Sequence, residues 1–173
     1  MAEMFENADL EDLDDDEESE GDQDAVSLLS ADHAEVKQMF ESYKQLVEED
    51  ADDEEKRELA EQICLALTVH ADIEEEIFYP AMRESIDDDL ALDEAEVEHA
   101  AAKDLILQIQ GMDPGDALYD AKVLVLGEYV EHHVEEEESE IFPAAEKSGV
   151  DLEALGAELA ERKQELLGAA EEE

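Results

Sequence analysis

Several residue types that usually indicate a secreted, membrane-bound or β-rich protein are scarce in this chain. Its single cysteine, Cys64, cannot form an intrachain disulfide, and tryptophan is absent. Only 7 glycines and 3 prolines are present, so the turn residues of β-hairpins are few. No apolar run approaches transmembrane length, and the acidic N-terminus lacks the apolar segment of a signal peptide. We therefore expect a cytoplasmic helical protein that has no membrane partner.

Basic residues are also scarce, since 10 Lys and Arg stand against 57 Asp and Glu, a formal net charge of −47. Such a chain repels nucleic acid and anionic membranes, so neither is an expected partner. The acid is spread over the whole chain, which favours a protein of a halophilic cell, because concentrated salt screens self-repulsion. The competing interpretation is an acidic protein that works beside a cation or a basic partner. No protein partner can be inferred from the sequence.

The organisation of the chain follows from where its charge and its apolar residues lie. Residues 1–24 hold no Lys or Arg and predict a disordered acidic N-terminal tail. Beyond the tail, apolar residues recur at helical spacing, with short polar connections between the helices. Helices are predicted over residues 25–48, 54–85, 91–110 and 114–147. This pattern predicts an all-α, up-down-up-down four-helix bundle over residues 25–149.

Two further predictions concern the ends of these helices. Asp113 is the expected N-cap of the fourth helix, with Pro114 at its first position. Gly149 is expected to close that helix. Residues 150–173 then predict a short C-terminal fifth helix, amphipathic, that caps one side of the bundle or meets a partner.

A repeated motif carries the chemistry of the chain. The segment HADIEEEIFYP begins at His70, and the segment HVEEEESEIFP begins at His133. In both, a glutamate follows the histidine by four residues and a proline follows that glutamate by six. On a helix, residues at i and i+4 lie on one face, roughly 6 Å apart. His70 with Glu74, and His133 with Glu137, should therefore converge on one point in the bundle interior.

Each copy of the motif is preceded by one histidine on the apolar stripe of the preceding helix, His33 in the first case and His99 in the second. Two hairpins of one design would bring four imidazoles and two carboxylates around a shared centre. So many buried acceptors are costly unless metal ions compensate them, and bridging carboxylates suggest two ions. Nitrogen and oxygen ligands without thiolate suit Fe, Mn or Zn, and iron is the usual occupant of such bundles.

Several local alternatives accompany this prediction. Pro80 and Pro143 either kink their helices so that these close over the site, or simply end them. His132 with Glu136 is an alternative inward pair, but the alignment of the prolines and the helical phase favour His133.

The same helical phase predicts which neighbouring residues face inward and which face solvent. Within the run of three glutamates, Glu74 should face inward, while Glu75 and Glu76 should face solvent. The tyrosines either hydrogen-bond to the ligands or, as the safer interpretation, pack in the core or on the surface; these are Tyr43, Tyr79 and Tyr129.

The combined pattern resembles the hemerythrin-like family, the HHE cation-binding domain, over residues 25–147. Members of that family carry a histidine in the first helix, HxxxE in the second, a histidine in the third, and a histidine with a carboxylate in the fourth. The segments SADHAEV, HADIEEEIFYP, EVEHAAAKDLI and HHVEEEESEIFP match this order. The resemblance implies a non-haem, oxo- or hydroxo-bridged di-iron centre, with Glu74 and Glu137 as bridges and the four histidines as terminal ligands.

The chain departs from the oxygen-carrying members, which have a second histidine on helix 3, four residues from the first. At those offsets from His99 this chain has Ala95 and Lys103, and neither is an expected ligand. Either one iron keeps an open or water-filled position, or a carboxylate takes the place of the second histidine. Glu96 is better placed for that role than Glu98. The departure argues against reversible O₂ carriage and favours reactivity with O₂, NO or peroxide.

The expected function is therefore a metal-binding protein with two Fe ions, ahead of Mn or Zn, that binds or senses O₂ or NO or buffers iron. The alternative is a di-iron enzyme with oxidase, peroxide-removing or nitric oxide-handling activity. A ferritin-type oxidase is disfavoured, because ferritin-like sites combine Glu with ExxH rather than HxxxE. A metal-free acidic interaction bundle would require the repeat to be accidental.

Overall fold

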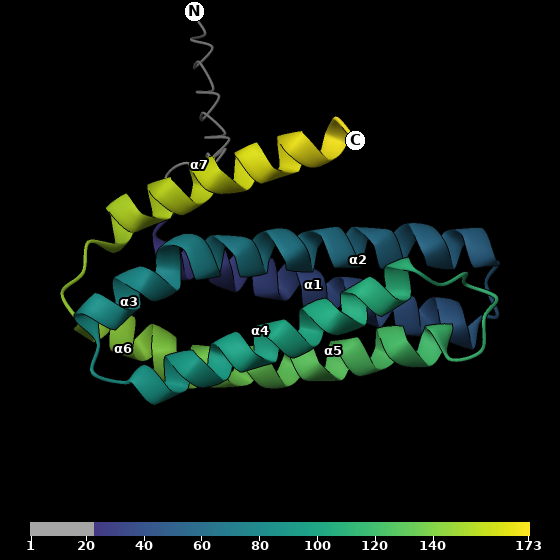
Figure 1. The fold of residues 1–173 in the computed structure, drawn as a ribbon, viewed down its shortest axis with the longest axis horizontal. Helices are drawn as coiled ribbons and strands as arrows, with labels where there is room; N and C mark the ends of the chain where they lie inside the picture. Colours follow the sequence, from purple (N-terminus) through teal and green to yellow (C-terminus); the bar gives the residue numbers. More distant parts are fainter. Residues whose placement is uncertain (1–22) are drawn as a thin grey trace, which may run out of the picture.

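A computed structural model describes residues 23–173, so the predicted tail falls almost wholly outside the described part of the chain. Within that part the chain is helical and contains no strand (Figure 1). The elements are α1 (Ala25–Glu48), α2 (Asp53–Ile73), the π-helical η2 (Glu74–Phe78), α3 (Tyr79–Ser85), α4 (Asp89–Gln110), α5 (Tyr119–Glu136), the π-helical η3 (Glu137–Ile141), α6 (Phe142–Lys147) and α7 (Leu152–Glu171).

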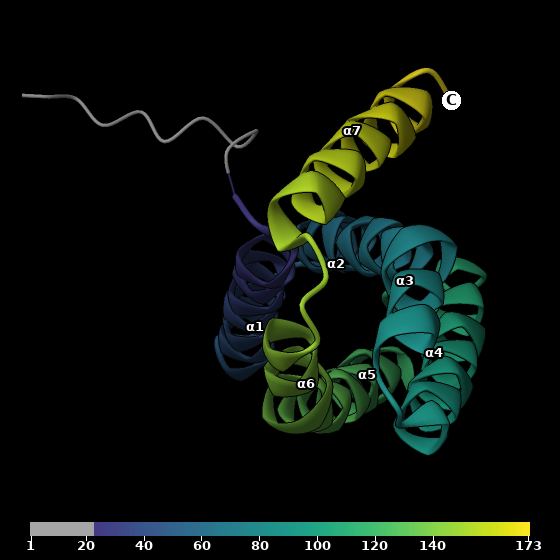
Figure 2. The same ribbon diagram turned by 90° about the vertical axis from the view of Figure 1, so that its left-hand side faces the viewer.

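These elements build an up-down-up-down bundle. The second rod is α2 continued by η2 and α3, and the fourth is α5 continued by η3 and α6. Seen from its end, the bundle is a ring of α1, α2, α4 and α5, with α7 lying outside it (Figure 2). The predicted all-α four-helix bundle with a fifth helix is confirmed.

Aspartate side chains begin several of the helices. Asp24 accepts a hydrogen bond from the backbone N–H of Ser27 at 2.8 Å, Asp52 from that of Glu55 at 3.0 Å, and Asp88 from that of Ala91 at 3.2 Å. Each bond satisfies one of the N–H groups that a helix leaves unpaired in its first turn. This chemistry fixes the start of α1, α2 and α4 and hence the phase of the inward residues.

The predicted start of the fourth helix is wrong, because α5 begins at Tyr119 rather than near Pro114. The Asp116 carboxylate accepts a hydrogen bond from the backbone N–H of Asp113 at 2.9 Å, which closes a turn instead of a helix. Arg57 of α2 also binds the Asp113 carboxylate at 3.0 Å, so that carboxylate is engaged elsewhere. Leu118, with φ of 75°, completes the connection in the left-handed region.

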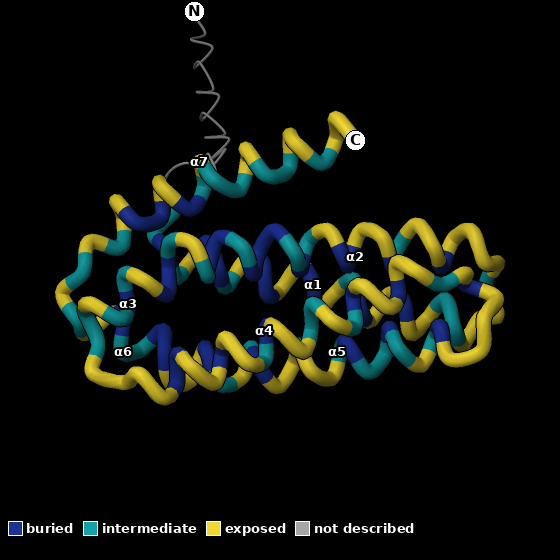
Figure 3. The backbone as a smooth tube through the Cα atoms, viewed as in Figure 1, coloured by how far each residue is buried: buried dark blue, intermediate teal, exposed yellow. Residues whose placement is uncertain are grey.

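Two apolar clusters fill the bundle, one toward each end (Figure 3). The first contains Leu29, Ile73, Phe78, Leu92, Ile141, Phe142 and Leu159, and the second contains Val36, Phe40, Ile63, Leu67, Ile106, Val123 and Leu126. The motif histidines fall between members of the two clusters on their helices, as His33 does between Leu29 and Val36. The site therefore lies in a polar layer that is sealed by apolar packing on both sides.

The C-terminal helix packs on the bundle, as one of the two predicted alternatives proposed. Leu155 and Leu159 of α7 are buried in the first apolar cluster. At Gly156 a Cβ atom would lie 2.3 Å from the backbone oxygen of Gln23, so only glycine permits this close approach. Among the described helices, none is both long and apolar enough to cross a membrane.

Candidate metal centre

Each inner glutamate opens a π-helical turn. The segment η2 begins at Glu74 and η3 begins at Glu137, and the turns close where the N–H groups of Tyr79 and Phe142 donate to the carbonyls of these glutamates. A π turn contains one more residue than an α turn and is frequent at functional sites. The two copies of the motif thus share a backbone irregularity as well as a sequence.

The prolines directly follow these π turns. Both helices continue beyond Pro80 and Pro143, to Ser85 and Lys147. The suggestion that the prolines merely end their helices is therefore wrong. A proline ring in a helix clashes with the carbonyl four residues earlier and removes its hydrogen bond, and a widened turn relieves both problems. The prolines thus accompany a local widening at the ligand glutamates.

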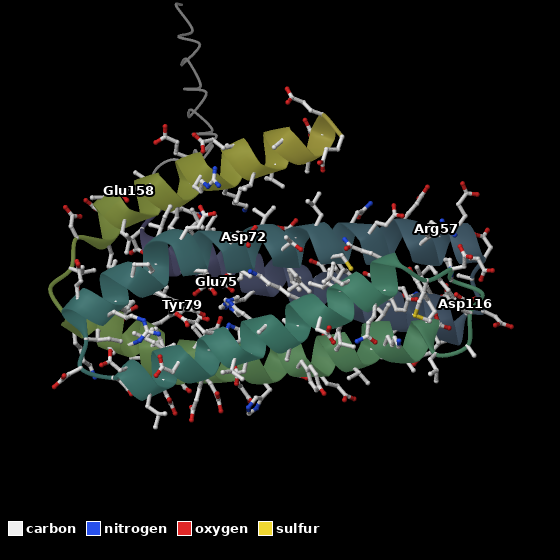
Figure 4. The ribbon with its side chains drawn as sticks, in the orientation of Figure 1. Arg57, Asp72, Glu75, Tyr79, Asp116 and Glu158 are labelled. Carbon is white, nitrogen blue, oxygen red and sulfur yellow. The ribbon has the colours of Figure 1, made fainter. Side chains whose placement is uncertain are left out.

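The π turn brings Tyr79 into the centre. On a regular α-helix, residues five positions apart point in different directions, but here the Tyr79 hydroxyl lies 2.9 Å from Oε2 of Glu74. It also lies 3.0 Å from Oε2 of Glu137 and 3.3 Å from Nε2 of His99, and the residue is 1% exposed. Figure 4 shows Tyr79 inside the bundle. Both alternatives for Tyr79 are therefore found: the ring packs in the first apolar cluster, and the hydroxyl bonds to the inward residues.

The first half-site consists of His33, His70 and Oε1 of Glu74. The two Nε2 atoms lie 3.1 Å apart, and Nε2 of His70 lies 2.7 Å from Oε1 of Glu74. Nε2 of His33 lies 3.9 Å from the same oxygen. All three residues are buried, and one ligand atom from each lies within 4.8 Å of the others, a spacing that could hold a metal ion.

The second half-site consists of His99, His133, Glu137 and Oε2 of Glu74. The two Nε2 atoms again lie 3.1 Å apart, with His99 3.1 Å from Oε2 of Glu74 and His133 2.8 Å from Oε2 of Glu137. These four residues are also buried and close enough to share an ion. Because Glu74 directs one oxygen into each half-site, its carboxylate can bridge two ions.

Every inward histidine is held from behind by a carboxylate. The Nδ1 atoms pair as follows: His33 with Glu138 at 3.1 Å, His70 with Asp32 at 3.0 Å, His99 with Glu75 at 3.0 Å and His133 with Glu98 at 2.6 Å. In a neutral imidazole, an Nδ1–H that donates to a carboxylate leaves the Nε2 lone pair pointing inward, free for a metal ion. Four such lone pairs then converge on two small volumes, which is the arrangement that metal ions require.

The outer carboxylates follow an internal two-fold pattern. Asp32 and Glu98 each precede a motif histidine in sequence and bind the histidine of the next helix in their own hairpin. Glu75 and Glu138 each follow a motif glutamate and bind a histidine of the other hairpin. Glu75 was expected to face solvent, and that expectation is wrong.

Lysines hold two of these outer carboxylates in place. Lys163 of α7 donates to Asp32 at 2.8 Å, which connects the C-terminal helix to the first half-site. Lys103 donates to Glu75 at 2.8 Å and to Asp72 at 3.2 Å. Both interactions restrict the carboxylates that orient the histidines.

Without metal, protons on the histidines compensate the negative charge of the buried carboxylates. Burial lowers the pKa of His70, but the Glu74 and Asp32 carboxylates outweigh it and raise that pKa to about 10. Burial likewise opposes a charged His133, yet Glu137 and Glu74 raise its pKa to about 11. Burial would raise the pKa of Glu74, but the surrounding histidines hold it well below its ordinary value. Metal binding must therefore displace protons from these imidazoles.

Glu137 is the least satisfied member of the site. Burial and the nearby charge of Glu74 raise the pKa of Glu137 to about 7. Its Oε1 is buried and receives no hydrogen bond from the described residues, and Oε1 of Glu74 is approached by Nε2 of His70 at 2.7 Å without hydrogen-bond geometry. Buried carboxylate oxygens are rarely left unpaired, so both atoms fit the role of metal ligands.

The remaining candidate residues lie outside the buried cluster. Glu96 is exposed and accepts a hydrogen bond from Arg83 at 3.0 Å, and Glu76 binds Arg162 at the surface. His132 is exposed and forms a separate group with Glu98 and Glu136.

The other two tyrosines and the cysteine are also placed by the structure. Tyr43 donates to Asp120 at 2.8 Å, and Tyr129 is half exposed. Burial raises the pKa of the Cys64 thiol to about 11, which keeps the thiol protonated and unreactive.

Two hollows lie against the histidines. One is a cavity of about 40 Å³ lined by all four motif histidines and by apolar side chains such as Val36, Leu67 and Ile106. The other is a groove of about 340 Å³ between α1 and α5 that reaches His33 and Glu138. The smaller cavity has room for a ligand of a few atoms.

Comparison with known families identifies this arrangement. The family described as the hemerythrin HHE cation binding domain matches residues 24–145. A protein named DNA nickase from Nostoc sp. strain PCC 7120 is 31% identical over 123 residues, which are 71% of this chain and 34% of that protein. The chain thus spans about a third of that relative's length.

A solved structure shares the fold. It is the crystal structure of a hemerythrin HHE cation binding domain-containing protein from Mycobacterium kansasii, which matches with a TM-score of 0.71. The match covers 86% of this chain and 90% of that one, at 23% sequence identity.

Proposed function

Given that the chain belongs to the hemerythrin HHE cation-binding family, we propose that its buried centre holds two iron ions and binds or senses a small ligand such as O₂ or NO. The observation that carries the proposal is the set of four Nε2 atoms that face inward because each Nδ1 faces a carboxylate. Such carboxylate–histidine pairs orient metal ligands in proteins and tune their basicity.

The proposed ligand set divides between the half-sites. His33 and His70 would hold one ion, His99 and His133 would hold the other, and Glu74 would bridge them. Glu137 would serve the second half-site, and its unpaired Oε1 is available as a second bridge atom. Iron in such nitrogen and oxygen ligands supplies redox chemistry and coordination of small molecules.

Tyr79 is the further ligand that we propose for the second half-site. On α4, the third helix of the bundle, Ala95 and Lys103 stand where the second histidine would be, and the Tyr79 hydroxyl points to Glu74, Glu137 and His99 instead. Phenolate oxygen is a hard donor that suits ferric iron. The proposed role for Glu96 loses support, since that carboxylate pairs with Arg83.

The hollows support a small ligand rather than an organic substrate. The cavity beside the histidines has about 40 Å³, which admits a molecule of two or three atoms but not a metabolite. Its apolar walls favour an uncharged molecule such as O₂ or NO. The groove between α1 and α5 provides an approach from solvent toward His33.

A peroxide-removing or oxidase enzyme is the second candidate, and Tyr79 is the observation that favours it. The hydroxyl lies within hydrogen-bond distance of Glu74 and Glu137, so it is placed to hold or pass a proton at the centre. A carrier needs no such group. Turnover of hydrogen peroxide by the iron-loaded protein, reduced in Tyr79→Phe, would decide for the enzyme.

DNA nicking, which the name of the Nostoc relative raises, is a poorer match to this chain. The net charge of −47 opposes association with phosphates, and this chain spans only a third of that relative. We expect no strand breaks in supercoiled plasmid incubated with the iron-loaded protein. Nicking that disappears in His70→Ala would contradict this expectation.

Metal analysis combined with spectroscopy tests the proposal. The purified protein should contain about two Fe per chain and should show ferric absorption that shifts with azide. His70→Ala and His133→Ala should each lose iron, whereas the exposed neighbour His132→Ala should keep it. A protein that stays metal-free in iron-replete medium, with unchanged stability in both inward variants, would refute the proposal.

A further inference from the structure

We propose that Glu98, His132 and Glu136 form a third, solvent-facing cation site that receives a divalent metal ion and delivers it to the buried centre. This inference rests on the proposed iron centre, for which it supplies the route of loading. The site lies between α4 and α5, beside the second half-site.

The three residues are spaced as metal ligands. Nε2 of His132 lies 3.2 Å from Oε1 of Glu136, one turn further along α5, and 3.7 Å from Oε1 of Glu98 on α4. One ligand atom from each residue lies within 4.8 Å of the others. One imidazole and two carboxylates are a donor set that binds Fe²⁺, Co²⁺ or Zn²⁺.

Glu98 connects this group to the buried centre. While its Oε1 faces His132, its Oε2 lies 2.6 Å from Nδ1 of His133, the inward histidine of the second half-site. The Glu98 side chain is 24% exposed and that of His132 is 64% exposed, so the site can be reached from solvent. A single carboxylate thus stands between the exposed group and a proposed iron ligand.

A narrow acidic cleft continues inward from the same place. Its volume is about 10 Å³, roughly that of one water molecule, and it lies between α4 and the rod of α5 and η3. The carboxylates that line it belong to Glu94, Glu98, Glu136, Glu137 and Glu140, with His133 among them. Glu137 is 1% exposed, and its Oε1 receives no hydrogen bond from the described residues. The cleft therefore runs from exposed carboxylates to an unpaired buried one.

Among the described residues, the first half-site has no such acidic cleft behind His70, and the groove that reaches its His33 is lined by Lys37 and Lys44 as well as by carboxylates. The equivalent of Glu98 is Asp32, whose carboxylate is 9% exposed and is bound by Lys163 of α7. A lysine at that position repels a cation, whereas a cleft of carboxylates raises the local cation concentration and the rate of association. Metal ions should therefore load from the side of the second half-site.

The test compares Fe²⁺ uptake by apoprotein under anaerobic conditions in wild type, His132→Ala and Glu136→Gln. We expect uptake into the buried centre to be about tenfold slower in both variants, with the same final iron content of that centre. Glu131→Gln is the matched control, because it removes one charge from the same helix but faces the groove between α1 and α5, and it should load like wild type. Equal rates in all four proteins, or a lower final iron content of the buried centre in His132→Ala, would overturn the inference.

A second measurement separates this inference from the proposed function. Co²⁺ titrated into the iron-loaded protein should occupy about one additional site per chain, which His132→Ala should lose. If wild type takes up no iron at all, the proposed function fails, and the same titration on apoprotein still tests the exposed site. No difference in Co²⁺ binding between wild type and His132→Ala would overturn the third site.

Discussion

The two hairpins contribute the same ligand pattern, yet the two half-sites differ in what lies behind the ligands. Behind His70, the Asp32 carboxylate is buried and bound to Lys163 of the C-terminal helix. Behind His133, the equivalent Glu98 carboxylate is partly exposed and faces His132. Behind His70 the first half-site is therefore closed by a salt bridge, whereas behind His133 the second opens to an acidic cleft.

The two hairpins also differ in the residue that precedes each proline. Tyr79 precedes Pro80, and its hydroxyl enters the second half-site, whereas Phe142 precedes Pro143 and stacks on His33 with ring centroids 5.6 Å apart and planes 7° apart. The backbone at both places is the same π turn. The repeat thus fixes the inner ligands, while single side chains behind it distinguish the two half-sites.

The largest effect is expected at the glutamates, because Glu74 serves both half-sites and Glu137 serves one. Glu74→Ala should weaken binding of both ions by more than about a hundredfold, beyond the effect typical of outer partners. Glu137→Ala should weaken mainly the second site, leaving about one Fe per chain. Metal content after dialysis measures the difference. Equal loss of iron in both variants would mean that Glu137 bridges as Glu74 does.

The next largest effect concerns the outer carboxylates. Asp32→Asn breaks a buried ion pair with Lys163 and His70, so the apoprotein should lose about 3–5 kcal/mol of unfolding free energy. Glu98→Gln alters a partly exposed carboxylate and should cost less than about 1 kcal/mol. Urea unfolding of the two apoproteins measures this, with Lys163→Met as a check on the Lys163 contact. Similar losses in both variants would remove the distinction between a closed and an open half-site.

The sequence predicted which histidines and glutamates converge in the bundle interior because these residues obey ordinary helical geometry. His70 with Glu74, and His133 with Glu137, lie four residues apart in helices that stay regular up to each glutamate. The upstream histidines His33 and His99 lie on regular helices as well.

The sequence left two alternatives for Tyr79 open for a physical reason. A regular helical wheel sends position i+5 away from Glu74, and nothing in the local sequence except the following proline signals a π turn.

The outer carboxylates occupy matching positions in the repeat, but the high acidic content of the chain hides this pattern. Asp32 and Glu98 occupy matching positions before the upstream histidines, and Glu75 and Glu138 occupy matching positions after the inner glutamates. With 57 acidic residues in 173, such neighbours occur too often by chance to single out. Only the distances to Nδ1 distinguish them from the solvated acids.

A third prediction concerns protonation, in which the two half-sites agree. The folded-state pKa values of His70 and His133, about 10 and about 11, lie above the ordinary value near 6.5. Their stabilisation of the apoprotein is therefore fully present below about pH 6.5 and is lost as the pH rises through about 10 and 11. The loss should be on the order of a few kcal/mol.

Iron-loaded protein is the control for this pH dependence, since metal replaces the two protons and alkaline effects on other groups act equally on both forms. We expect the urea midpoint of apoprotein to fall between pH 7 and about 11 more steeply than that of iron-loaded protein. Calorimetry near pH 7.5 should show about three protons released on loading with ferric iron, two from these histidines and one from the Tyr79 hydroxyl, which would bind as phenolate. Parallel curves together with the release of only about one proton would show that these histidines are neutral in the apoprotein.

Exchanging the residues before the prolines should have the smallest effect on stability but a clear effect on the visible absorption spectrum. Tyr79→Phe removes a hydroxyl whose acceptors also contact His99 and His133, so the apoprotein should lose only about 1 kcal/mol. The ferric protein should lose its visible tyrosinate-to-iron absorption. In the double variant Tyr79→Phe/Phe142→Tyr, the hydroxyl would stand at the matching π turn beside His33. If the absorption returns, the single side chain before the proline sets the chemical difference between the half-sites. If it does not return, the parallel stacking of the residue 142 ring on His33 keeps the hydroxyl away from the ion.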